Sequence, residues 1–245
     1  MKCFRIAVRE GLSAGLVALS FLMASGQSLI SSAQAAGPAP TAFAAGKAKL
    51  IKGDYASAVK MLEAAVKARP GSSEAHLYLG QAYLKTRSYA QARTHLRAAI
   101  RLGKGSPVSQ KANAALMTLP KNYLAPRTGE DTRFIAYALG IVGRERGAGG
   151  QSKPTVLDFY ASWCHPCKLL EQDMDKVKST YGDKVNFMSI NVDDPSNEQV
   201  IEQYDVSPIP TVVFLSPDGQ VVSYSIGYSG PQNVQKEIEK VLARS

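Results

Sequence analysis

The sequence is poor in the residues that bind metals and hold cofactors. Its 245 residues include three cysteines, three histidines and one tryptophan. A zinc site needs about four ligands, so the two cysteines of the second half would have to meet His76, His95 and His165 from distant segments. Haem attachment requires a histidine directly after the second cysteine, where this chain has Lys168. This scarcity argues against a metal site and against a haem.

Long apolar runs are missing beyond the N-terminus. Residues 12–23 form an apolar stretch of roughly a dozen residues, which is short for a membrane span. A basic segment, residues 1–10, precedes it, and Ala33-Gln34-Ala35 fits a cleavage site. Residues 1–35 are therefore predicted to be a secretory signal peptide. The alternative is an uncleaved N-terminal anchor, and no membrane span is expected after this segment.

Loss of residues 1–35 would leave Cys164 and Cys167 as the only cysteines, because Cys3 lies in that segment. Export leads to an oxidising compartment, where disulfides persist. A loop this short restricts the unfolded chain little, so a structural disulfide is a poor explanation for the pair. The two thiols follow an apolar, β-favouring run, residues 155–161, and precede a predicted helix, residues 168–178. This context predicts thiol–disulfide exchange.

Positive charge is concentrated in the first half of the chain. Residues 37–150 carry a net charge of +12, and residues 151–245 carry −5. The simplest interpretation, which we favour, is that two solvated surfaces differ. The alternative is that the basic half attracts an acidic partner or docks on the acidic half of its own chain. Nucleic acid is not expected as a partner, since the chain has an export signal and lacks a groove-reading motif.

Residues 42–104 contain an internal repeat with a period of 34 residues. The period superposes five pairs of identical residues: Gly46 and Gly80, Tyr55 and Tyr89, Ala58 and Ala92, Leu62 and Leu96, and Ala65 and Ala99. The small residues allow paired helices to approach closely, and the leucine and alanine lie on one helical face. The period and the pattern resemble the tetratricopeptide repeat. We therefore expect an all-α helical-repeat domain over residues 39–118.

This resemblance covers two units, residues 39–72 and 73–106, and a further helix near 107–118 that would cap the stack. It implies a platform that binds a protein or peptide partner, and the alternative is a spacer or a dimerisation face. Residues 119–152 are predicted to be a linker. A possible helix within it, residues 132–142, would either begin the C-terminal domain or pack between the two domains.

From residue 153 the pattern alternates between strands and helices. The predicted strands are residues 155–161, 185–192, 211–215 and 220–225, and the predicted helices are residues 169–181, 196–204 and 234–242. This order predicts an α/β sandwich with a mixed sheet flanked by helices.

Two separated motifs in this region resemble the thioredoxin family, and the match covers about residues 153–245. Residues 156–167 resemble the active-site strand and helix start of thioredoxin, and residues 206–211 resemble its cis-proline loop. The resemblance implies that Cys164 attacks a disulfide and that Cys167 resolves the mixed disulfide. The redox-active Cys164–Cys167 disulfide would be the redox group, with no other cofactor and no metal.

The resemblance also implies roles for neighbouring residues. Asp158 lies within an apolar strand, where a carboxylate is costly, and resembles the buried acid that exchanges a proton with the second cysteine. The alternative is a solvent-facing strand residue. His165, Pro166 and Trp163 would tune or shield the thiols. For His165 the alternative is an exposed side chain with little effect.

Pro210 would be in the cis form and would leave the backbone of Ile209 free to pair with an extended substrate. The chain departs from the family in two places. Ser189 stands where thioredoxins often carry a lysine beside the buried acid, and His165-Pro166 replaces the usual Gly-Pro between the cysteines. The pair between the cysteines tunes the redox potential, so the direction of electron flow stays open.

The sequence therefore predicts an exported thiol–disulfide oxidoreductase in the periplasm or an equivalent compartment. Its expected partners are client proteins with disulfides, an unidentified electron donor or acceptor, and a protein bound by the repeats. One alternative is a disulfide oxidase or isomerase. Another is a non-enzymatic adaptor in which the repeats bind a partner and the thioredoxin-like module is passive.

Overall fold

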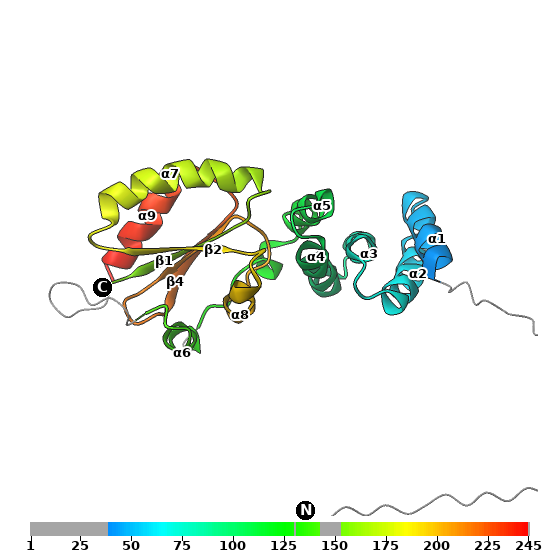
Figure 1. The fold of residues 1–245 in the computed structure, drawn as a ribbon, viewed down its shortest axis with the longest axis horizontal. Helices are drawn as coiled ribbons and strands as arrows, with labels where there is room; N and C mark the ends of the chain where they lie inside the picture. The colour runs from blue at the N-terminus through cyan, green and yellow to red at the C-terminus, as the bar shows by residue number, and fades with distance from the viewer. Residues whose placement is uncertain (1–38, 130, 143–152, 245) are drawn as a thin grey trace, which may run out of the picture. The chain divides into compact units, whose positions relative to one another are not determined.

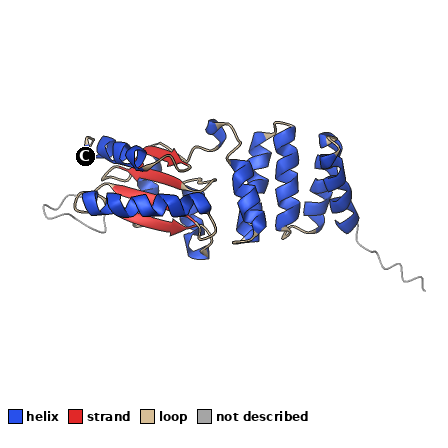
Figure 2. Ribbon diagram, turned by 90° about the horizontal axis from the view of Figure 1, so that it is seen from above, coloured by secondary structure: helices blue, strands red, loops and turns tan. Residues whose placement is uncertain are grey.

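The computed structural model describes residues 39–129, 131–142 and 153–244. The predicted signal peptide with Cys3 and the glycine-rich end of the predicted linker lie outside these residues. The N-terminal part is all helical, as predicted, and each helix packs on the next (Figures 1 and 2). The helices are α1 (Ala39–Ile51), α2 (Tyr55–Ala68), α3 (Ser73–Lys85), α4 (Tyr89–Gly103) and α5 (Pro107–Leu116). We refer to residues 39–118 as the repeat domain.

The repeated glycines and leucines hold paired helices together. A Cβ atom built on Gly46 would lie 2.7 Å from Cγ of Leu62, and one built on Gly80 would lie 2.7 Å from Cγ of Leu96. Both leucines are fully buried. The missing glycine side chains thus make room for the leucine of the next helix in both units, which explains the 34-residue repeat in terms of packing.

The C-terminal part is an α/β domain of residues 131–142 and 153–244. Its sheet has the order β2-β1-β3-β4, with β1 parallel to β2 and antiparallel to β3, and with β3 antiparallel to β4. The strands are β1 (Thr155–Tyr160), β2 (Asn186–Asn191), β3 (Thr211–Leu215) and β4 (Val221–Ile226). The helices are α6 (Asp131–Ala138), α7 (His165–Tyr181), α8 (Glu198–Gln203) and α9 (Pro231–Leu242). The predicted mixed sheet is confirmed.

Helices cover both faces of this sheet. Helices α7 and α9 pack on one face, and α6 and α8 lie against the other (Figure 1). In α6, Ile135 and Ala136 join the core, and the hydroxyl of Thr132 accepts a hydrogen bond of 3.1 Å from the N–H of Val221. The helix expected in the linker was predicted either to begin the C-terminal domain or to pack between the two domains. The structure shows the first arrangement, in which α6 belongs to the α/β domain.

Four helices differ from their predicted bounds. Helix α6 ends at Ala138 rather than at residue 142, and α9 begins at Pro231 rather than at residue 234. Helix α7 begins at His165 rather than Lys168, because the side chain of Cys164 accepts the N–H of Cys167 and caps the helix. The predicted helix over residues 196–204 is divided into a 3₁₀ turn, Pro195–Asn197, and α8. A second 3₁₀ turn, Lys121–Tyr123, lies in the predicted linker.

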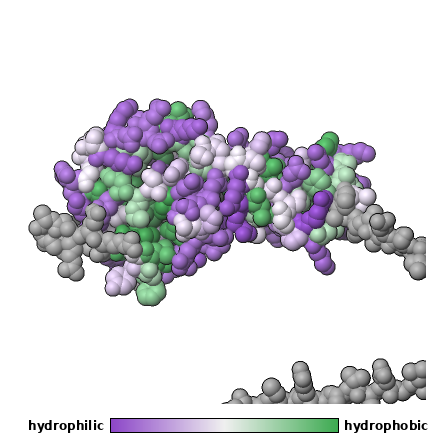
Figure 3. Space-filling view, viewed as in Figure 1, coloured by the Kyte–Doolittle hydropathy of each residue, from purple (hydrophilic) through white to green (hydrophobic). Residues whose placement is uncertain are grey.

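The outer surface of α7 is largely hydrophilic (Figure 3). Helix α6 instead exposes Phe134 and Tyr137 to solvent. Within the described ranges, no helix combines the length and the apolar character that a membrane crossing requires.

Candidate active site

The two cysteines lie at the first turn of α7, at the end of the loop that leaves β1. A disulfide joins Cys164 to Cys167, and the N–H of Cys167 donates a hydrogen bond of 3.2 Å to Sγ of Cys164. Pro166 lies in the first turn, where its missing N–H costs no helical hydrogen bond. The free N–H groups and the helix dipole place partial positive charge beside the Cys164 sulfur, which favours its thiolate form when the disulfide is reduced.

Trp163 and His165 flank the first cysteine in different ways. The indole N–H of Trp163 donates a hydrogen bond of 2.7 Å to a carboxylate oxygen of Asp193. The ring packs against the buried clusters of both domains, so its position is fixed. His165 is exposed, and its ring makes no hydrogen bond among the described residues. The side chain thus has the exposed position of the alternative interpretation.

Asp158 lies in the centre of the sheet, on a strand paired on both sides. It is 8% exposed, and its Oδ1 atom has no hydrogen-bond partner among the residues that the structure describes. Burial raises the pKa of Asp158 from 3.8 to about 6, although the positive charge of Lys178 on α7 lowers it in part. Ser189 lies beside Asp158 in the parallel register of β1 and β2, as the departure from the family predicts. The expected burial of this acid is confirmed.

The Ile209-Pro210 peptide bond is cis, as predicted. The prediction that the Ile209 backbone is free is wrong. Asn113 of α5 donates a hydrogen bond of 2.8 Å from its amide nitrogen to the carbonyl of Ile209. Its amide oxygen accepts a bond of 2.9 Å from the N–H of the same residue. The reason is that a side chain of the repeat domain satisfies both backbone groups of this buried loop.

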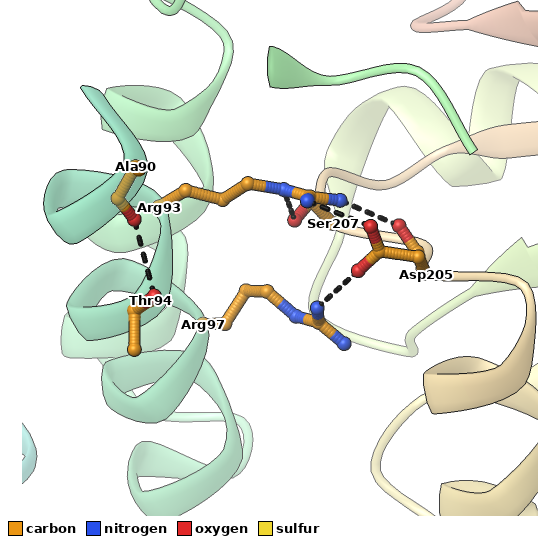
Figure 4. Close-up of polar contacts among 6 residues, drawn as sticks. All are labelled: Ala90, Arg93, Thr94, Arg97, Asp205 and Ser207. Atoms are coloured by element: carbon orange, nitrogen blue, oxygen red, sulfur yellow. Dashed lines mark hydrogen bonds and ion pairs between the residues drawn. The ribbon is translucent and has the colours of Figure 1, made fainter. Parts of the chain in front are cut away.

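The segment before Ile209 is held by two arginines of α4. Asp205 accepts a hydrogen bond of 2.8 Å from Nη1 of Arg93 and one of 2.7 Å from Nη1 of Arg97 (Figure 4). Arg93 also donates from Nε to the hydroxyl of Ser207, at 2.7 Å, and from Nη2 to the carbonyl of Asp205, at 2.6 Å. Part of the basic half therefore docks on the acidic half of its own chain, which is the interpretation of the charge asymmetry that we did not favour.

Beside these contacts lies a cleft of about 820 Å³. Arg93, Arg97 and Arg101 line one side, acidic residues from α8 and the turn before it line the other, and the cleft reaches Ser207 and Ile209. A third ion pair, of 3.6 Å between Arg101 and Glu198, joins its two sides. In the part of the chain that the structure describes, no group of three or more His, Cys, Asp or Glu side chains is arranged to hold a metal.

Sequence reasoning found the two cysteines, Asp158 and the proline loop, but it missed Asn113 and Arg93. Asn113 is 8% exposed and lies on α5 next to the buried Ala112. A single asparagine in a short helix carries no local signal that its amide is buried against a loop 96 residues away. For Arg93 the only signal was the excess of positive charge in its half of the chain.

Comparisons with known proteins agree with both motifs. The family model for thioredoxin matches residues 148–242, and a model for the tetratricopeptide repeat matches residues 43–107. The thioredoxin of Bacillus subtilis is 35% identical over 87 residues, which are 36% of this chain and 81% of that protein.

Two longer proteins match the same part of the chain. The thioredoxin-like protein HCF164, chloroplastic, of Arabidopsis thaliana is 36% identical over 91 residues, which are 37% of this chain and 35% of that protein. A homologue of the thiol:disulfide interchange protein TxlA from Synechocystis is 33% identical over 91 residues, 37% of this chain and 51% of that protein. The chain thus spans about a third and about half of the length of these two relatives.

Proposed function

Because this chain belongs to the thioredoxin family, we propose that it is a thiol–disulfide oxidoreductase that reduces disulfide bonds of client proteins through Cys164 and Cys167. The observation that carries the proposal is the capping of α7 by Cys164, with the N–H of Cys167 directed at its sulfur. This geometry stabilises a thiolate on the residue that attacks first. The repeat domain would present or select the client.

In the proposed reaction the Cys164 thiolate attacks one sulfur of a client disulfide and forms a mixed disulfide, and the other client sulfur leaves as a thiolate. The thiolate of Cys167 then attacks Sγ of Cys164. This step restores the Cys164–Cys167 disulfide and releases the second client thiolate. The client gains two electrons, and a dithiol donor protein would return the pair to its reduced form by the reverse exchange.

Asp158 is proposed to accept the proton of the Cys167 thiol. Both residues belong to elements that pack on each other, since Asp158 is on the sheet face that α7 covers and Cys167 is in the first turn of α7. With a pKa of about 6, Asp158 is largely ionised at neutral pH and still basic enough to take a proton.

The test is reduction of insulin by the pre-reduced full chain. We expect Cys164→Ser to abolish the reaction, because it removes the attacking sulfur. We expect Cys167→Ser to retain clients as mixed disulfides on Cys164, because the resolving sulfur is missing. A folded, fully reduced protein that leaves insulin intact would contradict the proposal. A cellular phenotype that survives Cys164→Ser and is lost with changes on the repeat surface would favour the adaptor.

The direction of electron flow is tested by the reduction potential of the Cys164–Cys167 pair. We propose a reducing role, for which the expected reduction potential is about −270 mV, the value of thioredoxin. A reduction potential of about −120 mV, as in strong oxidants, would favour an oxidase.

We also propose export, on the basis of the sequence of residues 1–35. N-terminal sequencing of the protein from an extracytoplasmic fraction should then begin at Ala36. A full-length N-terminus in the membrane fraction would support the uncleaved anchor instead.

A further inference from the structure

The carboxamide of Asn113 bonds to Ile209 in the way that a residue of a neighbouring strand would. A hydrogen-bonded pair of residues in an antiparallel sheet exchanges one N–H···O bond in each direction. Asn113 makes both bonds from one side chain, at 2.8 and 2.9 Å. All four groups are buried, so water does not replace them. The amide therefore occupies the place where an extended client would pair with the loop.

Two more contacts join the repeat domain to the surroundings of the dithiol. The ring of Trp163 packs against the buried cluster of α4 and α5, and a Cβ built on Gly105 would lie 3.6 Å from its Cδ1 atom. Met117, just after α5, lies close to Gly227, since a Cβ built on that glycine would be 3.0 Å from the methionine Cε. Gly227 in turn donates its N–H to the carbonyl of Pro210, at 2.8 Å.

The Cys164–Cys167 disulfide itself is enclosed in this arrangement. Cys164 is 2% exposed, although its sulfur has to be reached by a client disulfide. The arginine contacts to Asp205 and Ser207 attach α4 to the segment that leads into Ile209 (Figure 4). The repeat domain thus contacts three sides of the site: Trp163, the Ile209-Pro210 loop and Gly227.

We propose that Asn113 is a specificity-determining residue that occupies the client's backbone site in the resting protein. This inference rests on the proposed oxidoreductase function. An extended segment of a client that offers its own N–H and C=O to Ile209 displaces the amide and gains the two bonds that Asn113 gives up. A disulfide in a folded, non-extended segment lacks those groups and does not compete. The repeat domain therefore selects unfolded or extended clients.

The test compares two disulfides with the pre-reduced full chain. Insulin offers a peptide backbone beside its disulfide, whereas 5,5′-dithiobis(2-nitrobenzoate) has none. We expect Asn113→Ala to reduce insulin about tenfold faster than the natural protein, because two hydrogen bonds no longer compete with the client. The rate with the small disulfide should stay unchanged. Gln110→Ala, an exposed change on the same helix, is the matched control and should alter neither rate.

An unchanged or slower insulin rate in folded Asn113→Ala, with a normal rate for the small disulfide, would overturn the inference and leave the oxidoreductase function intact. A natural protein that reacts with neither disulfide would refute the function, and the inference would fall with it. Arg97→Ala provides a second variant should Asn113→Ala fail to fold. It removes one contact to Asp205 and should also raise the insulin rate, and an unchanged rate would count against the inference.

A second readout follows from Trp163, the single tryptophan of the chain. When Cys167→Ser is loaded with a cysteine peptide as a mixed disulfide, displacement of α5 should expose the indole. Its fluorescence emission should move to longer wavelength. An emission spectrum that does not change on loading would show that the client binds without displacing the repeat domain, which contradicts the inference.

Discussion

At the scale of single residues, Asp158 combines a structural cost with a proposed chemical role. Its carboxyl is buried in the sheet, and one of its oxygens has no hydrogen-bond partner within the described part of the chain. The pKa in the folded protein, about 6, lies above the value of 3.8 in the unfolded chain. At a pH below both pKa values the carboxyl is protonated in both states and contributes nothing to the pH dependence of stability. As the pH rises from about 4 to above 6, the folded state is progressively destabilised, because it holds the proton more tightly than the unfolded state.

We expect Asp158→Asn to remove this pH dependence. Each pKa unit corresponds to about 1.4 kcal/mol, so the free energy of unfolding of the variant relative to the natural protein should rise by about 2 to 3 kcal/mol between pH 4 and pH 7.5. Urea denaturation across this range measures the change. Asp183→Asn, on an exposed residue, is the control. Parallel pH profiles for the natural protein and Asp158→Asn would show that the carboxyl titrates normally.

The same residue illustrates what could be predicted from the sequence. An acid inside an apolar strand has few explanations, so its burial could be predicted from Asp158 and its neighbours alone. Asn113 has many possible explanations, because asparagine is equally compatible with an exposed position on a helix. Its partner is 96 residues away, and only the folded chain brings the amide to Ile209. The cysteines were predictable, and the contact between Asn113 and Ile209 was not.

At the scale of elements, the packing of α3 on α4 depends on a missing side chain. We expect Gly80→Ala to lower the free energy of unfolding by about 1 to 3 kcal/mol, because the new Cβ would lie 2.7 Å from Cγ of the buried Leu96. Chemical denaturation measures the change. Gly71→Ala is the control, since no atom of the described ranges lies within 4 Å of a Cβ built there.

A double variant tests whether the contact itself is responsible. In Gly80→Ala, replacement of Leu96 by alanine should cost less than it does in the natural protein, because it also relieves the clash. Strictly additive effects would show that Gly80 acts through the backbone and not through Leu96.

The elements could be predicted from periodicity because each depends on local patterns. The ends of the elements depend on individual capping side chains, which periodicity does not reveal. Helix α7 starts three residues before its predicted position because a cysteine side chain is an unusual helix cap. The helix predicted after Asp194 was divided because that carboxylate accepts the N–H and the hydroxyl of Ser196 and begins a 3₁₀ turn.

At the scale of the whole molecule, charge joins the repeat domain to the α/β domain. We expect Asp205→Asn to lower the free energy of unfolding by about 1 to 3 kcal/mol, because it removes the charge that Arg93 and Arg97 share. Asparagine tolerates the left-handed backbone conformation at this position, where φ is 54°. The loss should shrink in 0.5 M NaCl, since salt screens the natural contact.

Asp131→Asn is the matched control for this prediction. Asp131 pairs with Arg127 across 3.5 Å, and both side chains are about half exposed. Such a surface pair contributes less than about 1 kcal/mol. If both variants lost the same small amount of stability, the arginine contacts to Asp205 would be no stronger than an ordinary surface pair.

The bonds between Asn113 and Ile209 also bear on the order in which the protein is made. A ribosome completes residues 39–118 before it reaches Cys164, and N-terminal domains generally fold first during synthesis. If the repeat domain folds in that order, α5 would be in place when the cysteines emerge, and the newly made dithiol would meet its own repeat domain before it meets other thiols. We expect fewer stray mixed disulfides on a nascent natural chain than on nascent Asn113→Ala, which trapping with an alkylating reagent during synthesis would measure.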